Sequence, residues 1–100
     1  MNTTTRHIAI FASGNGSNAI NIIRYLQKKR QDASFTVLSN KPEAPVLEKA
    51  RQLQVETLVF NRQDFYHEQT VLNYLQASGT QLIVLAGFLW LVPAAIVRAF

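Results

Sequence analysis

The clearest chemical signal in this chain is the run Ser13-Gly14-Asn15-Gly16-Ser17-Asn18-Ala19, which separates an apolar stretch from a helical pattern. Gly14 and Gly16 permit positive φ and a close approach of the backbone to a ligand. The amide groups at the start of the following helix lack partners within the helix, and the positive end of the helix dipole lies behind them. The run therefore predicts a phosphate-binding loop. In the alternative interpretation, Ser17 or Asn18 only caps the helix, but a cap needs a single such residue.

The spacing of the glycines narrows the class of phosphate ligand. Gly14-x-Gly16-x-x-Ala19 matches the dinucleotide fingerprint in its variant with a final alanine. That fingerprint expects Asp or Glu after the second strand to hold the ribose hydroxyls, whereas this chain has Ser39-Asn40-Lys41-Pro42 there. NAD is therefore disfavoured, and an NADP-binding module remains an alternative, with Lys41 on the 2′-phosphate. The Walker pattern is absent, because no Gly-Lys-Ser/Thr follows the loop.

Other site chemistries find little support in the residue types. The chain has no cysteine, which excludes disulfides, cysteine-ligated metals and a cysteine nucleophile. His7 begins the first predicted strand and His67 lies on the third predicted helix, and neither has a partner residue nearby in a catalytic pattern. We expect both histidines to be structural or exposed. No spacing typical of metal ligands is present, so no metal is expected.

Apolar stretches alternate along the chain and predict four strands that are each followed by a helix. Strands that are apolar on both faces require a parallel sheet covered on both sides. With right-handed crossovers, the order β-α-β-α-β-α-β-α predicts the N-terminal half of a doubly wound sheet, with strand order 3-2-1-4. The predicted strands are residues 7–12, 35–38, 55–60 and 82–86. The predicted helices run from Ser17 to about Arg30, from Pro45 onwards, from a cap at Asp64 to Ser78-Gly79, and from Pro93 onwards.

Length and composition limit the chain to one small domain or a piece of a larger one, with 100 residues and 11.3 kDa. A hydrophobic fraction of 48% and a charged fraction of 16% exclude intrinsic disorder. The net charge of +4 permits an anionic partner. However, the basic residues are scattered, and the one run, Lys28-Lys29-Arg30, suits the negative end of a helix dipole. We expect neither a nucleic acid nor a membrane as partner.

The apolar run at residues 82–97 is shorter than the ~20 residues that span a bilayer, and Gly87 and Pro93 interrupt it. Because no signal peptide is visible either, we expect a cytoplasmic protein. The fourth strand is the most hydrophobic and would lie at the sheet edge, where an apolar strand tends to pair with another chain. We therefore expect further strands to cover it in a longer protein, or self-association through this strand.

Three segments resemble the phosphoribosylglycinamide formyltransferase family. They are residues 11–18 (Phe-Ala-Ser-Gly-Asn-Gly-Ser-Asn), 37–41 (Val-Leu-Ser-Asn-Lys) and 84–88 (Val-Leu-Ala-Gly-Phe), and the similarity runs along the whole chain. The resemblance implies a Rossmann-like formyltransferase fold. It also implies transfer of a formyl group from 10-formyltetrahydrofolate to the amine of glycinamide ribonucleotide, in purine biosynthesis. The related methionyl-tRNA formyltransferases match less well, since they open with a different turn.

The resemblance also implies roles for individual residues. Gly16, Ser17 and Asn18 would bind the phosphoribosyl end of the substrate, with Asn15 shaping the turn. A ribose 5-phosphate needs backbone amides and no acidic residue on the second strand, so this agrees with the loop chemistry. The pterin of the folate co-substrate would lie against Phe88, Leu89, Trp90, Leu91, Val92 and Val97.

The chain departs from the family pattern at three places. Leu89 and Trp90 replace a Met and a basic residue that often follow the Gly-Phe pair, and Arg62 is a shifted substitute for an arginine that meets the folate. The family's catalytic Asn, His and Asp begin in an Asn-Ile-His-Pro-Ser-Leu-Leu-Pro segment, which is not present up to Phe100. We therefore expect residues 1–100 to be the N-terminal, substrate-binding part of one formyltransferase domain, truncated before the catalytic segment and inactive alone.

Overall fold

Four parallel strands form one sheet in the computed structural model, which describes residues 6–29 and 33–100. They are β1 (Arg6–Phe11), β2 (Ala33–Ser39), β3 (Glu56–Val59) and β4 (Thr80–Leu85). The spatial order β3-β2-β1-β4 confirms the predicted order 3-2-1-4. After β3 the chain crosses back over the sheet to place β4 beside β1. The carboxyl ends of β1 and β4 therefore form a topological switch point, the place where doubly wound sheets bind ligands.

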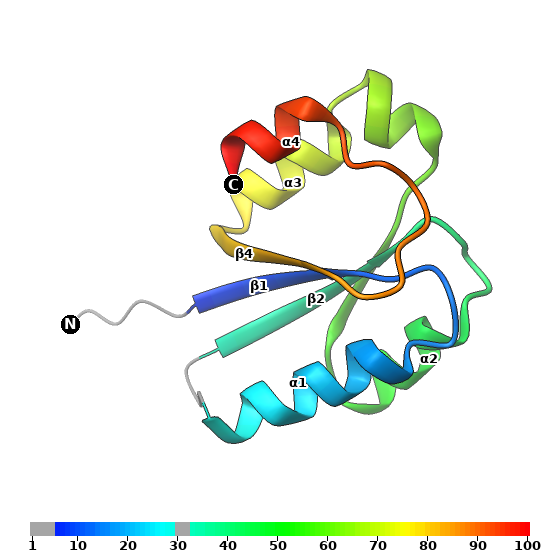
Figure 1. The fold of residues 1–100 in the computed structure, drawn as a ribbon, viewed down its shortest axis with the longest axis vertical. Helices are drawn as coiled ribbons and strands as arrows, with labels where there is room; N and C mark the ends of the chain where they lie inside the picture. The colour runs from blue at the N-terminus through cyan, green and yellow to red at the C-terminus, as the bar shows by residue number, and fades with distance from the viewer. Residues whose placement is uncertain (1–5, 30–32) are drawn as a thin grey trace.

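Helices cover both faces of the sheet (Figure 1). The helices α1 (Ser17–Lys29) and α2 (Pro45–Gln52) lie on one face, and α3 (Thr70–Ala77) and α4 (Ala94–Ala99) on the other. In β1, Ile8 and Ile10 pack toward the first pair of helices, and the alternate residues Ala9 and Phe11 pack toward the second. This two-sided burial is the reason why the central strands are apolar throughout.

The end of α1 agrees with the charge pattern of the sequence. Lys28 and Lys29 lie in the last turn of the helix, where a cation complements the negative end of the dipole. Arg30, the third member of the predicted basic run, lies outside the described residues.

The third predicted helix is divided in two, contrary to the prediction of one helix from Asp64 to Ser78-Gly79. A π-helix, η1 (Gln63–His67), comes first, and α3 follows after Gln69, which adopts a left-handed conformation at φ 55°. The predicted cap at Asp64 is wrong by three residues. Asn61 Oδ1 accepts the N–H of Asp64 at 2.8 Å, and Asp64 Oδ2 accepts the N–H of Asn61 at 3.1 Å. This reciprocal pair is a capping box, in which the acidic residue is the second partner.

The apolar run at residues 82–97 separates into β4, a loop and α4, as predicted. In residues 6–29 and 33–100, no helix has both the length and the apolar character needed to cross a membrane. β4 lies at the edge of the sheet, and Leu82 and Leu85 on it are 50% and 54% exposed. Self-association through this edge stays a prediction.

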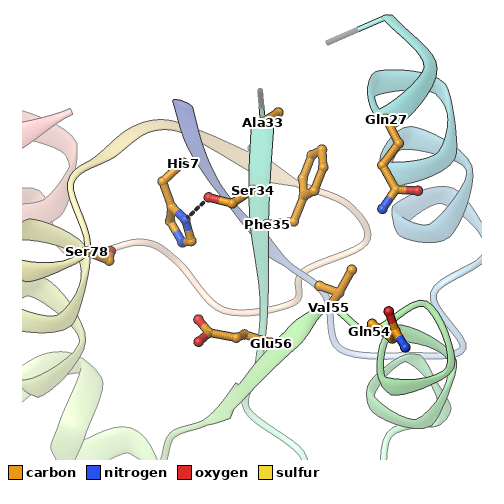
Figure 2. A pocket seen from close by; sticks show the side chains of 9 residues that line it. All are labelled: His7, Gln27, Ala33, Ser34, Phe35, Gln54, Val55, Glu56 and Ser78. Atoms are coloured by element: carbon orange, nitrogen blue, oxygen red, sulfur yellow. Dashed lines mark hydrogen bonds between the residues drawn. The ribbon is translucent and has the colours of Figure 1, made fainter. Parts of the chain in front are cut away.

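Hydrogen-bonded side chains cross the sheet near the amino ends of its strands. The two ring nitrogens of His7 lie 2.7 Å from Ser34 Oγ and 2.9 Å from Thr36 Oγ1, and Thr36 Oγ1 lies 2.8 Å from Tyr74 Oη on α3. Figure 2 shows His7 and Ser34 facing each other beside a cavity of about 590 Å³. Both ring nitrogens of His7 are engaged in hydrogen bonds, as a structural histidine requires. Burial, and secondarily the nearby Glu56 carboxylate, raise the pKa of the Tyr74 hydroxyl, although its bond to Thr36 opposes the shift.

We expect Tyr74 to make the fold lose stability at alkaline pH. Its pKa in the folded state is raised above 10.0, so folding favours the protonated phenol. That contribution is complete below pH 10 and is lost as the pH rises through the raised pKa. Tyr74→Phe should lower the free energy of unfolding by about 1 kcal/mol near neutral pH, because a hydrogen bond is lost.

The measurement is urea unfolding between about pH 8 and about pH 11. Tyr74→Phe should lose less stability across this range than the unsubstituted chain, whereas Tyr25→Phe, at a 60% exposed position, should follow the unsubstituted chain. Equal losses in all three proteins would contradict the assignment to Tyr74.

Candidate functional site

The glycine-rich loop between β1 and α1 lines a cavity of about 290 Å³ at the carboxyl ends of β1 and β4. All four residues predicted to bind the substrate lie along it: Asn15, Gly16, Ser17 and Asn18. Gly14 also lines the cavity, and the opposite wall is formed by Ala86 and Gly87, which follow β4. Figure 1 shows these two loops, in blue and orange, at the same end of the sheet.

Ala86 and Gly87 were not predicted as part of the site. The sequence could have indicated them, because a glycine directly follows the fourth predicted strand. The order 3-2-1-4 places that strand beside β1, and so places this glycine beside the glycine-rich loop. Gly87 has φ 73°, and nothing lies within 4 Å of where a Cβ would be. Its conformation, rather than its packing, therefore requires glycine.

Unpaired backbone amides are the main chemical content of the cavity. Asn15 Oδ1 accepts the N–H of Ser17 at 2.9 Å and its hydroxyl at 3.1 Å, which closes the turn before α1. Within the described residues, no hydrogen bond is made by the amides of Gly14, Asn15, Gly16, Asn18 and Ala19. The loop precedes the N-terminus of the 13-residue helix α1, whose dipole favours negative charge there. The arrangement can therefore hold an anion through main-chain donors.

Gly16 is the residue that brings the loop against α2. It has φ 79°, and a Cβ at this position would overlap the side chain of Val46, which is fully buried. The N–H of Val46 donates to the carbonyl of Gly14 at 3.3 Å. The loop is thus seated on the first turn of α2, at a distance that only glycine permits.

Ser13 connects three loops and was not predicted as a site residue. Its side chain is buried, donates to Asn40 Oδ1 at 2.7 Å and accepts the N–H of Leu89 at 3.2 Å. The partners follow β2 and β4, so one hydroxyl joins the segments that leave three neighbouring strands. The sequence could have indicated this role, because Ser13 is a small polar residue directly after a buried strand.

The six residues predicted to line a pterin pocket do not share one surface. Phe88 and Trp90 pack against an aromatic cluster formed with Phe11, Phe60 and Phe65. Leu89 and Leu91 point away from it and are 72% and 86% exposed. Val92 and Val97 line an apolar groove of about 200 Å³, together with Ile83, Leu85, Ile96 and Phe100.

The remaining predicted polar residues lie away from the loop cavity. Neither His7 nor His67 is among the described residues that line it, and His67 is exposed on η1. Lys41, on which the NADP alternative depends, does not line it either. The part of the chain that the structure describes holds no group of three His, Cys, Asp or Glu placed to bind a metal ion.

A family model, curated proteins and solved structures of formyltransferases are similar to this chain. A family model described as "Formyl transferase" matches residues 6–100. A phosphoribosylglycinamide formyltransferase of Bacillus subtilis is 32% identical over 100 residues, which are 95% of this chain and 51% of that protein. One from Dictyostelium discoideum is 31% identical over 109 residues, which cover 96% of this chain and 53% of that protein. The chain thus spans about half the length of the curated relatives it matches.

Solved structures show the same relation. The crystal structure of phosphoribosylglycinamide formyltransferase from Brucella melitensis matches with a TM-score of 0.83 and 34% identity, over 96% of this chain and 53% of that one. That of glycinamide ribonucleotide transformylase 1 from Geobacillus kaustophilus matches with a TM-score of 0.82 and 27% identity, over 97% and 54%. The fold of nearly the whole chain is therefore shared with about half of each of these proteins.

Gly16→Ala should disrupt the loop, and Gly14→Ala is its matched control. A side chain at position 16 meets both a left-handed φ and the buried Val46, so we expect a loss of about 2–4 kcal/mol in the free energy of unfolding. At position 14 a Cβ would have no atom within 4 Å, and φ is not positive, so Gly14→Ala should change stability by no more than about 1 kcal/mol. Urea unfolding of both variants measures the difference, and equal stabilities would contradict the packing argument.

Ser13→Ala should loosen the contact between the three loops. Its removal leaves the part-buried amide oxygen of Asn40 and the N–H of Leu89 without their partner, which should cost about 1–3 kcal/mol. Amide hydrogen exchange should become faster at Leu89. The control is Gln76→Ala, at an exposed position on α3, with a change of at most about 0.5 kcal/mol. If the two variants behave alike, the hydroxyl of Ser13 is not a structural link.

Proposed function

This chain belongs to the formyl transferase family, and on that premise we propose that it forms the substrate-binding half of a phosphoribosylglycinamide formyltransferase. The observation that carries the proposal is the loop cavity, where four lining residues before and at the start of α1 have main-chain amides without partners in the described residues: Gly14, Asn15, Gly16 and Asn18. The names of the relatives support the choice of reaction, and the free amides support the choice of a phosphate-bearing substrate.

In this proposal the loop binds the phosphoribosyl end of glycinamide ribonucleotide. Gly16 and Asn18 offer main-chain amides to the phosphate, and Asn15 holds the turn that aims them through its bonds to Ser17. Ser17 binds the phosphate by exchanging its hydroxyl bond to Asn15 for one to the ligand. The cavity wall at Ala86 and Gly87 limits the space beside the phosphate to about 290 Å³. No described residue with a carboxylate lines the cavity, so an anion meets no repulsion there.

The co-substrate in this proposal is 10-formyltetrahydrofolate, which supplies the formyl group. The residues present are compatible with a flat heterocycle that has polar edges. Between residues 87 and 92, the amides of Phe88, Trp90 and Val92 make no hydrogen bond within the described residues. The nearby groove at Val92 and Val97 is apolar. Apolar walls with a few oriented polar groups are typical of small-molecule sites.

The described residues contribute binding and orientation rather than proton transfer. Formyl transfer requires the substrate amine to lose a proton as it attacks the formyl carbon, and that step needs an acid–base group. Neither histidine borders the loop cavity, and His7 has both ring nitrogens engaged. We therefore propose that the catalytic Asn, His and Asp are not among residues 1–100. We also propose that the enzyme works in the cytoplasm.

The test is a thermal-shift titration of the chain with glycinamide ribonucleotide, ribose 5-phosphate and NADPH in parallel. We expect the first two to raise the melting temperature, by about 10–20 °C at a free ligand concentration of 100 times Kd. NADPH should have no effect. A shift with NADPH alone would favour the NADP-binding module, and no shift with any ligand would overturn the loop assignment. With both substrates added, the chain alone should give no turnover, and turnover at an enzymatic rate would place the catalytic group within residues 1–100.

A further inference from the structure

We infer that Tyr66 and Arg62, at the π-helix η1, are positioning residues for the loop at residues 86–92. The inference rests on the proposed function in one respect, because this loop carries the amides assigned to the folate co-substrate. Its structural content is independent of that assignment. Two contacts from η1 hold the second half of the loop, and no role has been given to either residue so far beyond a shifted folate contact for Arg62.

Tyr66 holds the main chain of the loop. Its hydroxyl donates to the carbonyl of Leu91 at 2.6 Å, a short bond between residues 25 positions apart. Leu91 itself is 86% exposed, so its side chain does not anchor this part of the loop. The phenol ring also lies 4.9 Å from the ring of Phe65, which is buried. The aromatic core therefore holds the Tyr66 ring in place, and the Tyr66 hydroxyl holds the Leu91 carbonyl.

Arg62 holds the indole side chain of Trp90. Its guanidinium carbon lies 4.6 Å from the centre of the Trp90 ring and 6.0 Å from that of Tyr66. These distances are within the range of cation–π attraction, which is strongest for Trp. In the described residues, Arg62 has no carboxylate within 4.0 Å. The two aromatic rings are thus its principal partners.

The shape of η1 brings the two side chains to one side. Arg62 and Tyr66 are four residues apart, and the π-helical bond from the N–H of Glu68 to the carbonyl of Gln63, at 2.9 Å, widens this turn. The capping box between Asn61 and Asp64 fixes the start of the turn. Such single π-helical turns are frequent at functional sites.

The main chain of the loop depends on the Tyr66 bond because it makes few other hydrogen bonds within the described residues. Its first half is tied by two bonds, from the N–H of Ala86 to the carbonyl of Phe11 at 2.9 Å and from the N–H of Leu89 to Ser13 Oγ at 3.2 Å. Beyond Leu89, the bond from Tyr66 is the one hydrogen bond to the loop within the described residues. The direction of the Trp90 and Val92 amides is therefore set from η1.

The test uses the fluorescence of Trp90, which is the only tryptophan of the chain. Tyr66→Phe removes one hydroxyl and keeps the ring, and Arg62→Gln removes the cation and keeps the polarity. We expect either variant to make Trp90 about twofold more accessible to acrylamide and to shift its emission to longer wavelength. Tyr25→Phe and Arg24→Gln, two exposed positions on α1, are the matched controls and should leave both quantities unchanged.

A binding measurement separates the inference from the proposed function. Affinity of the chain for a reduced folate should fall about fivefold in Tyr66→Phe, the effect of one hydrogen bond, whereas affinity for glycinamide ribonucleotide should change less than twofold. If the unsubstituted chain binds no folate, the proposed co-substrate site is wrong, and the fluorescence result still decides whether η1 positions the loop. Unchanged quenching and emission in both variants would overturn the inference, since the aromatic core alone would then hold Trp90.

Discussion

The hydroxyl of Ser13 is the interaction on which the geometry of the candidate site depends. It is buried, it donates to Asn40 and it accepts from the amide of Leu89, so it joins the segments that follow β1, β2 and β4. Main-chain bonds from Ala12 to Leu38 and from Ala86 to Phe11 join the strand ends, and the Ser13 hydroxyl links the segments beyond them. A serine is suited to this place because one hydroxyl is both donor and acceptor and needs little space. The glycine-rich loop and the loop at residues 86–92 are held against each other by this side chain.

The two ends of the sheet differ in whether their polar groups have hydrogen-bond partners. At the carboxyl ends, backbone amides are left without partners and the side chains are small, which leaves space for a ligand. At the amino ends, His7, Thr36 and Tyr74 satisfy one another across β1, β2 and α3. Buried polar groups stabilise a fold only when they are paired, so the amino end is the structural end. Among the described residues, amides without partners lie at the carboxyl ends of β1 and β4, beside a cavity where a ligand can bind them.

Packing around the loop at residues 86–92 shows how a binding surface is built from core residues. Phe88 and Trp90 extend the aromatic cluster, and the exposed Leu89 and Leu91 alternate with them. Some apolar residues of this segment therefore pack in the core, and the others form part of the exposed surface. The amides of Phe88, Trp90 and Val92 make no hydrogen bond within the described residues, and η1 contacts this backbone and Trp90 from one side.

Residue patterns alone determined the alternation of strands and helices, the order 3-2-1-4 and the glycine-rich turn at residues 13–19, because burial and glycine conformation act over a few neighbouring residues. Tertiary structure decided the rest. The division of the third helix at Gln69, the bridge from Ser13 to Asn40 and Leu89, and the contact of Arg62 with Trp90 each join positions whose distance in space the local pattern does not encode. Asn61 and Asp64 show the limit well: the residue types for a cap were visible, but only the backbone path decided which of them begins the helix.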